Sequence, residues 1–176
     1  VVDMAFDADV FSYMSNCSDR GSVLIGDARL RYAELPPASQ DVLFVDAFSS
    51  DAIPTHLVTQ EAFALYVSRM APGGLIFFHT SNRAMDISSV VLRLSDAAGL
   101  GARRIWVPSG LETHPFPDLF TGSEGVVVGD PALIARLAET HPDWDEVSPS
   151  PLVDVWTDDY SSVIGAMRAH MGKNLE

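Results

Sequence analysis

Four polar side chains follow an apolar run in the first third of the chain. The run spans residues 42–45, Asp46 ends it, and Ser49, Ser50 and Asp51 come within the next five positions. An uninterrupted apolar run of this length is typical of a strand buried on both faces of a parallel sheet. Ligands of open parallel sheets bind beyond the carboxyl ends of the strands. A carboxylate at that edge can accept a proton or bind a cation.

The carboxylates also have structural interpretations, and the sequence leaves both open. An Asp at a strand end, such as Asp46 or Asp51, often begins a turn by bonding its own backbone two residues on. Asp27 follows a short apolar run at 23–25 and is well placed to cap a helix, the default role of an Asp in that position. Thr157 or Asp158 can likewise cap the last helix.

A second group of polar residues follows the next apolar run, at 75–78. His79 and Asn82 come directly after it, so they are expected at the same sheet edge as Asp46. A hydrogen bond from the His79 ring to backbone is the simpler alternative. The five histidines have no metal-ligand spacing, and we expect no metal site.

The elements that position these residues alternate between strands and helices. This alternation predicts an α/β fold with a mostly parallel sheet flanked by helices. The expected strands span 22–27, 41–46, 75–79, 103–108 and 124–129. The expected helices span 1–16, 28–35, 58–70, 87–98 and 131–141, with a last helix ending near residue 171.

Length and composition narrow the class of protein. The chain has 176 residues, and we expect one domain over 1–174, with 175–176 as a tag remnant. No apolar run approaches the roughly 20 residues of a membrane span, and no secretory signal begins the sequence. The single cysteine, Cys17, excludes an internal disulfide and favours the cytoplasm. The net charge of -13 argues against nucleic acid and suits a cationic small molecule.

Four motifs together resemble one family. They are Gly-Asp-Ala-Arg-Leu at 26–30, Val-Asp-Ala-Phe-Ser-Ser-Asp-Ala-Ile-Pro at 45–54, Ala-Pro-Gly-Gly at 71–74 with His-Thr-Ser-Asn-Arg at 79–83, and Trp-Thr-Asp-Asp-Tyr-Ser at 156–161. They resemble the spermidine synthase-like domains, particularly those fused to membrane transporter segments in bacteria. The 45–54 motif is the most specific. The resemblance implies a Rossmann-like fold of the class I methyltransferase type.

The resemblance also implies an activity. Spermidine synthases serve polyamine biosynthesis by transferring an aminopropyl group from decarboxylated S-adenosylmethionine to a diamine such as putrescine, without a metal. Asp46 matches the catalytic aspartate of the family, and Asp51 matches a second carboxylate that binds the other ammonium group. Asp27, with Ala28, matches the contact to the adenosyl nucleoside. The remaining residues implied at the substrate site are Ser49, Ser50 and Asp158.

The sequence departs from the family pattern in two places. No Gly-rich nucleoside loop precedes Asp27, so we expect a domain truncated at its N-terminus. Ala47 and Phe48 are inserted after Asp46, and the Pro and Gly that normally follow the second carboxylate are replaced at 52–53. Two alternatives therefore stay open: an S-adenosylmethionine-dependent methyltransferase-like enzyme, or a non-catalytic binding or regulatory fragment of a larger membrane protein. Exposed sheet edges would favour self-association.

Overall fold

The computed structural model describes residues 2–7, 9–12, 14, 16, 22–47, 54–110 and 122–173. The chain divides into two compact units, Val1–Glu34 and Leu35–Glu176, which are described separately. The extent of a single domain over 1–174 stays a prediction, as does the N-terminal truncation.

The first unit contains two short helices, α1 (Val2–Ala5) and α3 (Ala28–Ala33). The expected helix over 1–16 is interrupted after Ala5, where the chain enters turns. Residues 22–27, expected as a strand, form none, because no strand among the described residues pairs with them.

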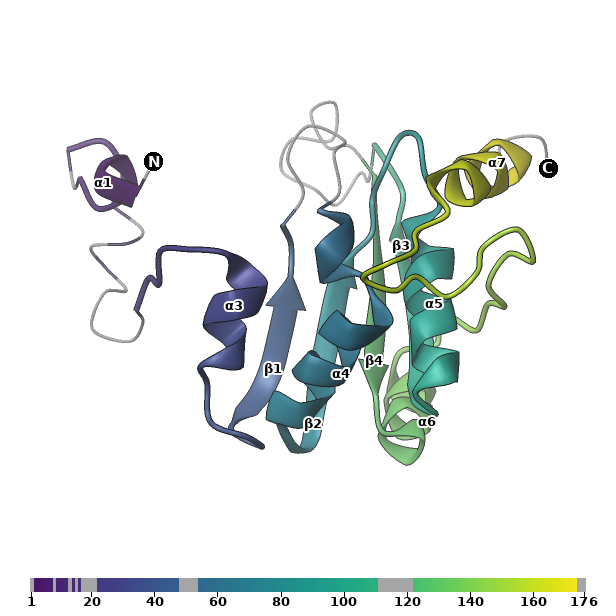
Figure 1. Cartoon of the computed structure of the whole chain (residues 1–176), viewed down its shortest axis with the longest axis horizontal. Helices are drawn as coiled ribbons and strands as arrows, with labels where there is room; N and C mark the ends of the chain where they lie inside the picture. The colour runs from purple at the N-terminus through teal and green to yellow at the C-terminus, as the bar shows by residue number, and fades with distance from the viewer. Residues whose placement is uncertain are drawn as a thin grey trace. The chain divides into compact units, whose positions relative to one another are not determined.

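The second unit follows the predicted order of strands and helices from residue 40 onward (Figure 1). One short strand, β5, falls in a Pro-rich stretch where none was expected. No helix within the described ranges is long and apolar enough to span a bilayer. The elements are β1 (Gln40–Val45), η2 (Thr55–Leu57), α4 (Gln60–Arg69), β2 (Met70–His79), α5 (Ile87–Ala97), β3 (Gly101–Val107), β4 (Ser123–Gly129), α6 (Pro131–Thr140), β5 (Trp144–Asp145) and α7 (Val163–Lys173).

The five strands form one open sheet in the order β1-β2-β4-β3-β5. The α/β class is confirmed, but the pairing is more mixed than expected: β1 and β2 are parallel, whereas β4 is antiparallel to both β2 and β3, and β5 to β3. β1, β2 and β3 therefore run in one direction, with the reversed β4 between β2 and β3. The difference lies at β4, which follows β3 in the chain and pairs with it directly as an antiparallel neighbour.

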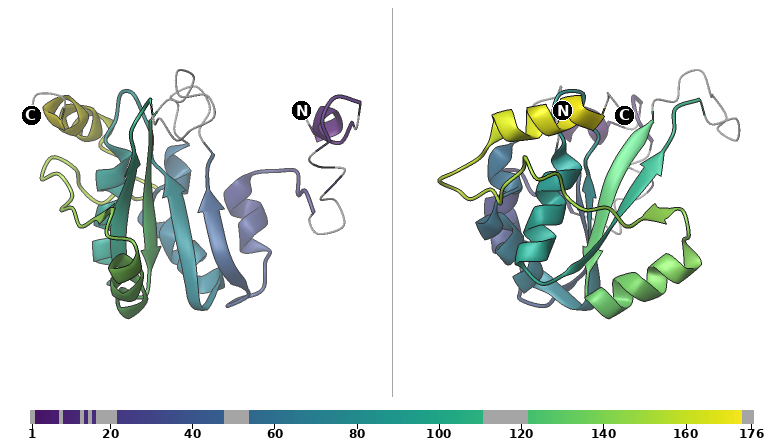
Figure 2. Two further views of the ribbon diagram at one scale, coloured as in Figure 1. Left: turned by 180° about the vertical axis from the view of Figure 1, so that it is seen from behind. Right: turned by 90° about the vertical axis from the view of Figure 1, so that its right-hand side faces the viewer.

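Helices cover both faces of the sheet (Figure 2). α4 and α5 lie on one side and α6 on the other. On the α4 side the ring of the fully buried Phe78 stacks on Phe63, with centroids 5.8 Å apart. On the α6 side Gly101 and Gly129 leave room for Ile134, because a Cβ at Gly101 would lie 3.1 Å from the Cβ of Ile134. This packing fixes the sheet and, with it, the ends of β1 and β2.

Candidate functional site

The site begins where β1 and β2 end side by side, at the upper edge of the sheet in Figure 1. Val45 pairs with Phe78 in this parallel register, so the residues that follow them, Asp46 and His79, are also neighbours. Asp46 Oδ1 lies 2.9 Å from His79 Nδ1. The Asp46 side chain is 50% exposed and that of His79 30% exposed. Within the described residues, Asp46 Oδ2 has no hydrogen-bond partner.

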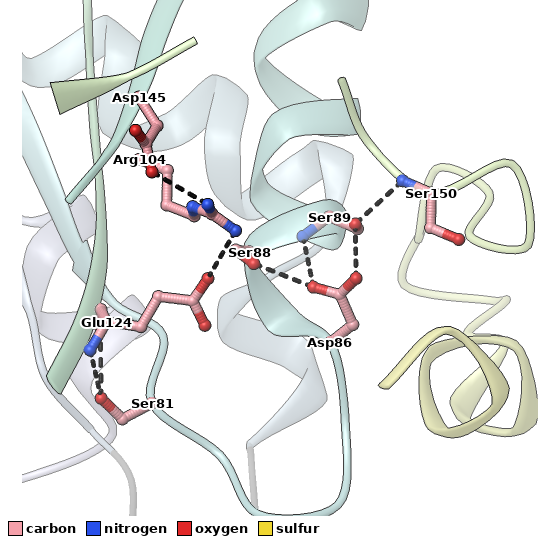
Figure 3. Close-up of polar contacts among 8 residues, drawn as sticks. All are labelled: Ser81, Asp86, Ser88, Ser89, Arg104, Glu124, Asp145 and Ser150. Carbon is pink, nitrogen blue, oxygen red and sulfur yellow. Dashed lines mark hydrogen bonds and ion pairs between the residues drawn. The ribbon is translucent and has the colours of Figure 1, made fainter. Parts of the chain in front are cut away.

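Ser81 holds the other side of the imidazole. Its Oγ lies 2.8 Å from His79 Nε2 and accepts a hydrogen bond of 2.7 Å from the backbone N–H of Glu124. The Glu124 carbonyl oxygen is 3.3 Å from the same hydroxyl and accepts the Thr80 N–H at 2.8 Å. The end of β2 is thereby tied to the start of β4, as the contact between Ser81 and Glu124 in Figure 3 shows.

An ion-pair cluster supports Glu124 in turn. Arg104 on β3 places one terminal nitrogen 3.9 Å from Glu124 Oε1 and the other 2.9 Å from Asp145 Oδ2 (Figure 3). Asp145 belongs to β5, the strand that the sequence did not predict. The sequence therefore does not predict this cluster, although it does predict that Arg104 lies on a strand.

Asp46, His79 and Ser81 are joined like the acid, base and nucleophile of a serine hydrolase. The Ser81 hydroxyl, however, is part-buried and already bonded to the backbone of β4. The chain also lacks the Gly-x-Ser-x-Gly turn that exposes a nucleophilic serine. The exposed group of the three is the Asp46 carboxylate, so the arrangement is suited to a carboxylate base held by an imidazole.

Asp158, expected at the substrate site, makes its described contacts with the start of α4. Thr59 Oγ1 donates to Asp158 Oδ1 at 2.8 Å, and the Asp158 N–H donates to Glu61 Oε2 at 2.9 Å. The alternative that Thr157 or Asp158 caps the last helix is wrong. Ser162 has that role, since its Oγ accepts the N–H of Gly165 near the start of α7. A cap must directly precede the helix, and Ser162 is the residue before Val163.

Other expected site residues have local roles or lie outside the described ranges. Asp27, in the first unit, caps α3 by accepting the Leu30 N–H at 3.0 Å, and Ala28 is the first residue of that helix. The Asn82 side-chain oxygen accepts the backbone N–H groups of Ala84 and Met85 and so stabilises a turn. The three residues outside the described ranges are Ser49, Ser50 and Asp51.

His79 and Ser81 are the residues that sequence reasoning undervalued. The sequence predicts His79 at the same edge as Asp46, but it does not predict their contact and indicates no role for Ser81. The signal was present, because residues that follow two adjacent parallel strands lie at one edge. No group of three or more His, Cys, Asp or Glu in the described part of the chain can hold a metal ion.

No sequence-family model matches the chain, and no curated protein matches it in sequence. Among solved structures, spermidine synthase from Thermotoga maritima is 11% identical with a TM-score of 0.51, over 96% of this chain and 55% of that one. A probable spermidine synthase from Corynebacterium glutamicum is 16% identical with a TM-score of 0.49, over 88% of this chain and 67% of that one. The chain spans about half the length of the Thermotoga protein. It has a spermidine synthase-like α/β fold.

Proposed function

We propose that this chain is a spermidine synthase-like aminopropyltransferase that uses decarboxylated S-adenosylmethionine and a diamine such as putrescine. One observation carries the proposal: Asp46, at the carboxyl end of parallel β1, is held through Oδ1 by His79, and its side chain is half exposed. The likeness in fold to the Thermotoga spermidine synthase supports it. So does the net charge of -13, which favours a cationic substrate.

For this reaction the protein must supply a base that deprotonates the amine and a site that orients the two substrates. A diamine is largely protonated at neutral pH, and only its neutral amine is a nucleophile. Asp46 Oδ2 takes one proton from the ammonium group and holds the amine against the carbon beside the sulfonium. The new N–C bond forms as that C–S bond breaks, and its electron pair neutralises the sulfur. The products are the extended amine and methylthioadenosine, with one proton released.

The other expected site residues complete the proposal. Asp51, with Ser49 and Ser50, binds the second ammonium group of the diamine by charge-assisted hydrogen bonds. Asp158 adds negative charge to the substrate site. Asp27 and Ala28 contact the adenosyl nucleoside, which is a separate part of the proposal because both belong to the first unit. A transporter segment in a longer protein, a cytoplasmic location and self-association through a sheet edge stay predictions.

Product analysis tests the reaction. Protein incubated with decarboxylated S-adenosylmethionine and putrescine should release spermidine and methylthioadenosine in equal amounts, measured by mass spectrometry. Transfer of a methyl group from S-adenosylmethionine instead would establish the methyltransferase alternative.

A thermal-shift titration separates binding from turnover. A nucleoside present at about 100 times its dissociation constant should stabilise the protein by ~2.7 kcal/mol. We expect this for decarboxylated S-adenosylmethionine and for methylthioadenosine. Absence of both a shift and a product would contradict the proposal and favour a non-catalytic fragment.

A further inference from the structure

The orientation of the Asp46 carboxylate depends on His79, a residue that takes no part in the proposed reaction itself. A carboxylate base works best when one lone pair points at the proton it removes. Asp46 follows β1 directly and is half exposed, so packing alone does not fix its side chain. His79 Nδ1, at 2.9 Å from Oδ1, is the described group that does.

The direction of that hydrogen bond follows from Ser81. Ser81 Oγ accepts the Glu124 N–H at 2.7 Å and has its own hydroxyl proton to donate, whereas the Asp46 carboxylate can only accept from Nδ1. Three acceptors lie within reach: His79 Nε2 at 2.8 Å, Glu124 O at 3.3 Å and Ser123 Oγ at 3.5 Å. The shortest contact is to His79 Nε2. A neutral imidazole that accepts at Nε2 carries its proton at Nδ1, and that proton points at Asp46.

The surroundings hold the end of β2, which carries His79, in place. His79 pairs across the sheet with Gly125, which has no side chain, and a Cβ there would lie 2.3 Å from the ring of Phe77. Phe77 also stacks on Phe44 of β1, with ring centroids 4.7 Å apart. Below the site, the aromatic pair joins β1 to β2, while Ser81 joins β2 to β4. The end of β2, which carries His79, is thus tied to both neighbouring strands.

We propose that His79 is a positioning residue: fixed by Ser81 as the tautomer protonated at Nδ1, it donates to Asp46 Oδ1 and orients Oδ2 toward the substrate. The hydrogen-bond assignment stands on geometry alone, and its effect on turnover rests on the proposed function. A neutral imidazole also leaves the negative charge of Asp46 intact for a cationic amine. Ser81 acts through His79, and Glu124 acts through Ser81.

The tautomer can be observed directly by long-range ¹H–¹⁵N NMR of the full chain labelled in histidine. The spectrum of His79→Asn identifies the His79 signals by their absence. We expect the pattern of a ring protonated at Nδ1 in the unmodified protein, and a loss of that preference in Ser81→Ala. A ring protonated at Nε2 would overturn the proposal. This result needs no turnover, so it decides the assignment even if the proposed function fails.

A matched pair of substitutions tests the consequence. The side-chain nitrogen of Asn lies close to the position of a histidine Nδ1, and that of Gln close to Nε2. His79→Asn therefore keeps the donor to Asp46, whereas His79→Gln keeps the contact with Ser81 and loses that donor. We expect His79→Gln to lower kcat by about tenfold to a hundredfold with little change in KM, and His79→Asn to retain most of kcat.

The pair also distinguishes positioning from a purely structural role. If His79 serves only to tie β2 to β4 through Ser81, Gln is the better replacement and should equal or exceed Asn in kcat, which would overturn the proposal. Thermal unfolding of both variants controls for folding. If the unmodified protein forms no spermidine, the proposed function fails, and the NMR result alone then supports or overturns the role of His79.

Discussion

Asp46 and Asp86 are both aspartates of the second unit, and they differ in how much of their carboxylate the fold uses. Asp86 is 2% exposed, and its oxygens accept from Ser88 Oγ at 2.8 Å, Ser89 N at 3.1 Å and Ser89 Oγ at 2.7 Å (Figure 3). It caps α5. Asp46 is half exposed and is held through one oxygen by His79 alone among the described residues.

The difference separates a structural carboxylate from one available for chemistry. A buried carboxylate is tolerated only when it is hydrogen-bonded, and the bonds that both oxygens of Asp86 accept serve the cap of α5. In Asp46, Oδ1 is oriented by its contact with His79, and Oδ2 has no partner among the described residues. Because the same chemical change can be made at both residues, the comparison can be tested by exchanging carboxylate for amide at each.

The largest effect is expected for Asp46→Asn. The amide still accepts the hydrogen bond from His79 but no longer removes a proton, so aminopropyl transfer should fall by about 10²- to 10⁴-fold. The free energy of unfolding should change by less than about 0.5 kcal/mol, as for an exposed side chain. Steady-state kinetics and urea unfolding measure the two quantities.

Asp86→Asn is the matched control for that experiment. It should retain kcat and lose stability, the reverse of Asp46→Asn. If Asp46→Asn instead unfolds the protein and keeps its turnover, the assignment of Asp46 as the base is wrong.

Asp86→Ala should have the next largest effect, on stability. The substitution removes the cap of α5 and leaves the buried hydroxyls of Ser88 and Ser89 without their acceptor, which should cost about 2–4 kcal/mol. Ser150 donates its N–H to Ser89 Oγ, so the loop that carries it should loosen as well. Urea unfolding measures the loss. A change below about 1 kcal/mol would show that the cluster relaxes onto water.

The elements of the second unit were predictable because their signals are local. Proline at the first position of α6 and the apolar run of β1 determine structure through their own backbone and burial. The antiparallel insertion of β4 was not predictable, since neither β3 nor β4 encodes its partner. The first unit shows the limit most clearly. The apolar run at 23–25 has the composition of a strand, yet a strand also requires a neighbour to pair with.

The sequence predicts where the site lies, at the end of β1, but only some of the residues that form it. Asp46 was placed correctly at a strand end, and the contact with His79 follows from the parallel register of β1 and β2. Ser81 depends on β4, whose position beside β2 no local pattern indicates. Asp158 has a contact that its motif does not indicate, the hydrogen bond from Thr59, and its place at the substrate site stays a prediction.

Asp158→Ala separates the two roles of that residue. Loss of the hydrogen bond with Thr59 should lower the free energy of unfolding by about 1 kcal/mol. Thr59→Ser, which keeps the hydroxyl donor, is the control and should cost less. A KM for putrescine that rises severalfold in Asp158→Ala but stays unchanged in Thr59→Val would establish the predicted substrate contact. An unchanged KM in both variants would contradict the substrate contact and show that Asp158 serves only to hold its loop to the start of α4.

The smallest effect, with the opposite sign, is expected for Thr80→Val. Thr80 lies between His79 and Ser81, is 1% exposed, and its Oγ1 has no hydrogen-bond partner in the described structure. A buried hydroxyl without a partner is destabilising, so a valine of nearly the same shape should raise the free energy of unfolding by about 1 kcal/mol. Ser81→Ala should instead lower it, because the neighbouring hydroxyl joins β2 to β4. Urea unfolding of both variants therefore compares two adjacent hydroxyls, one used by the site and one not. A loss of stability in Thr80→Val would mean that its hydroxyl is bonded to buried water and contributes to the fold as Ser81 does.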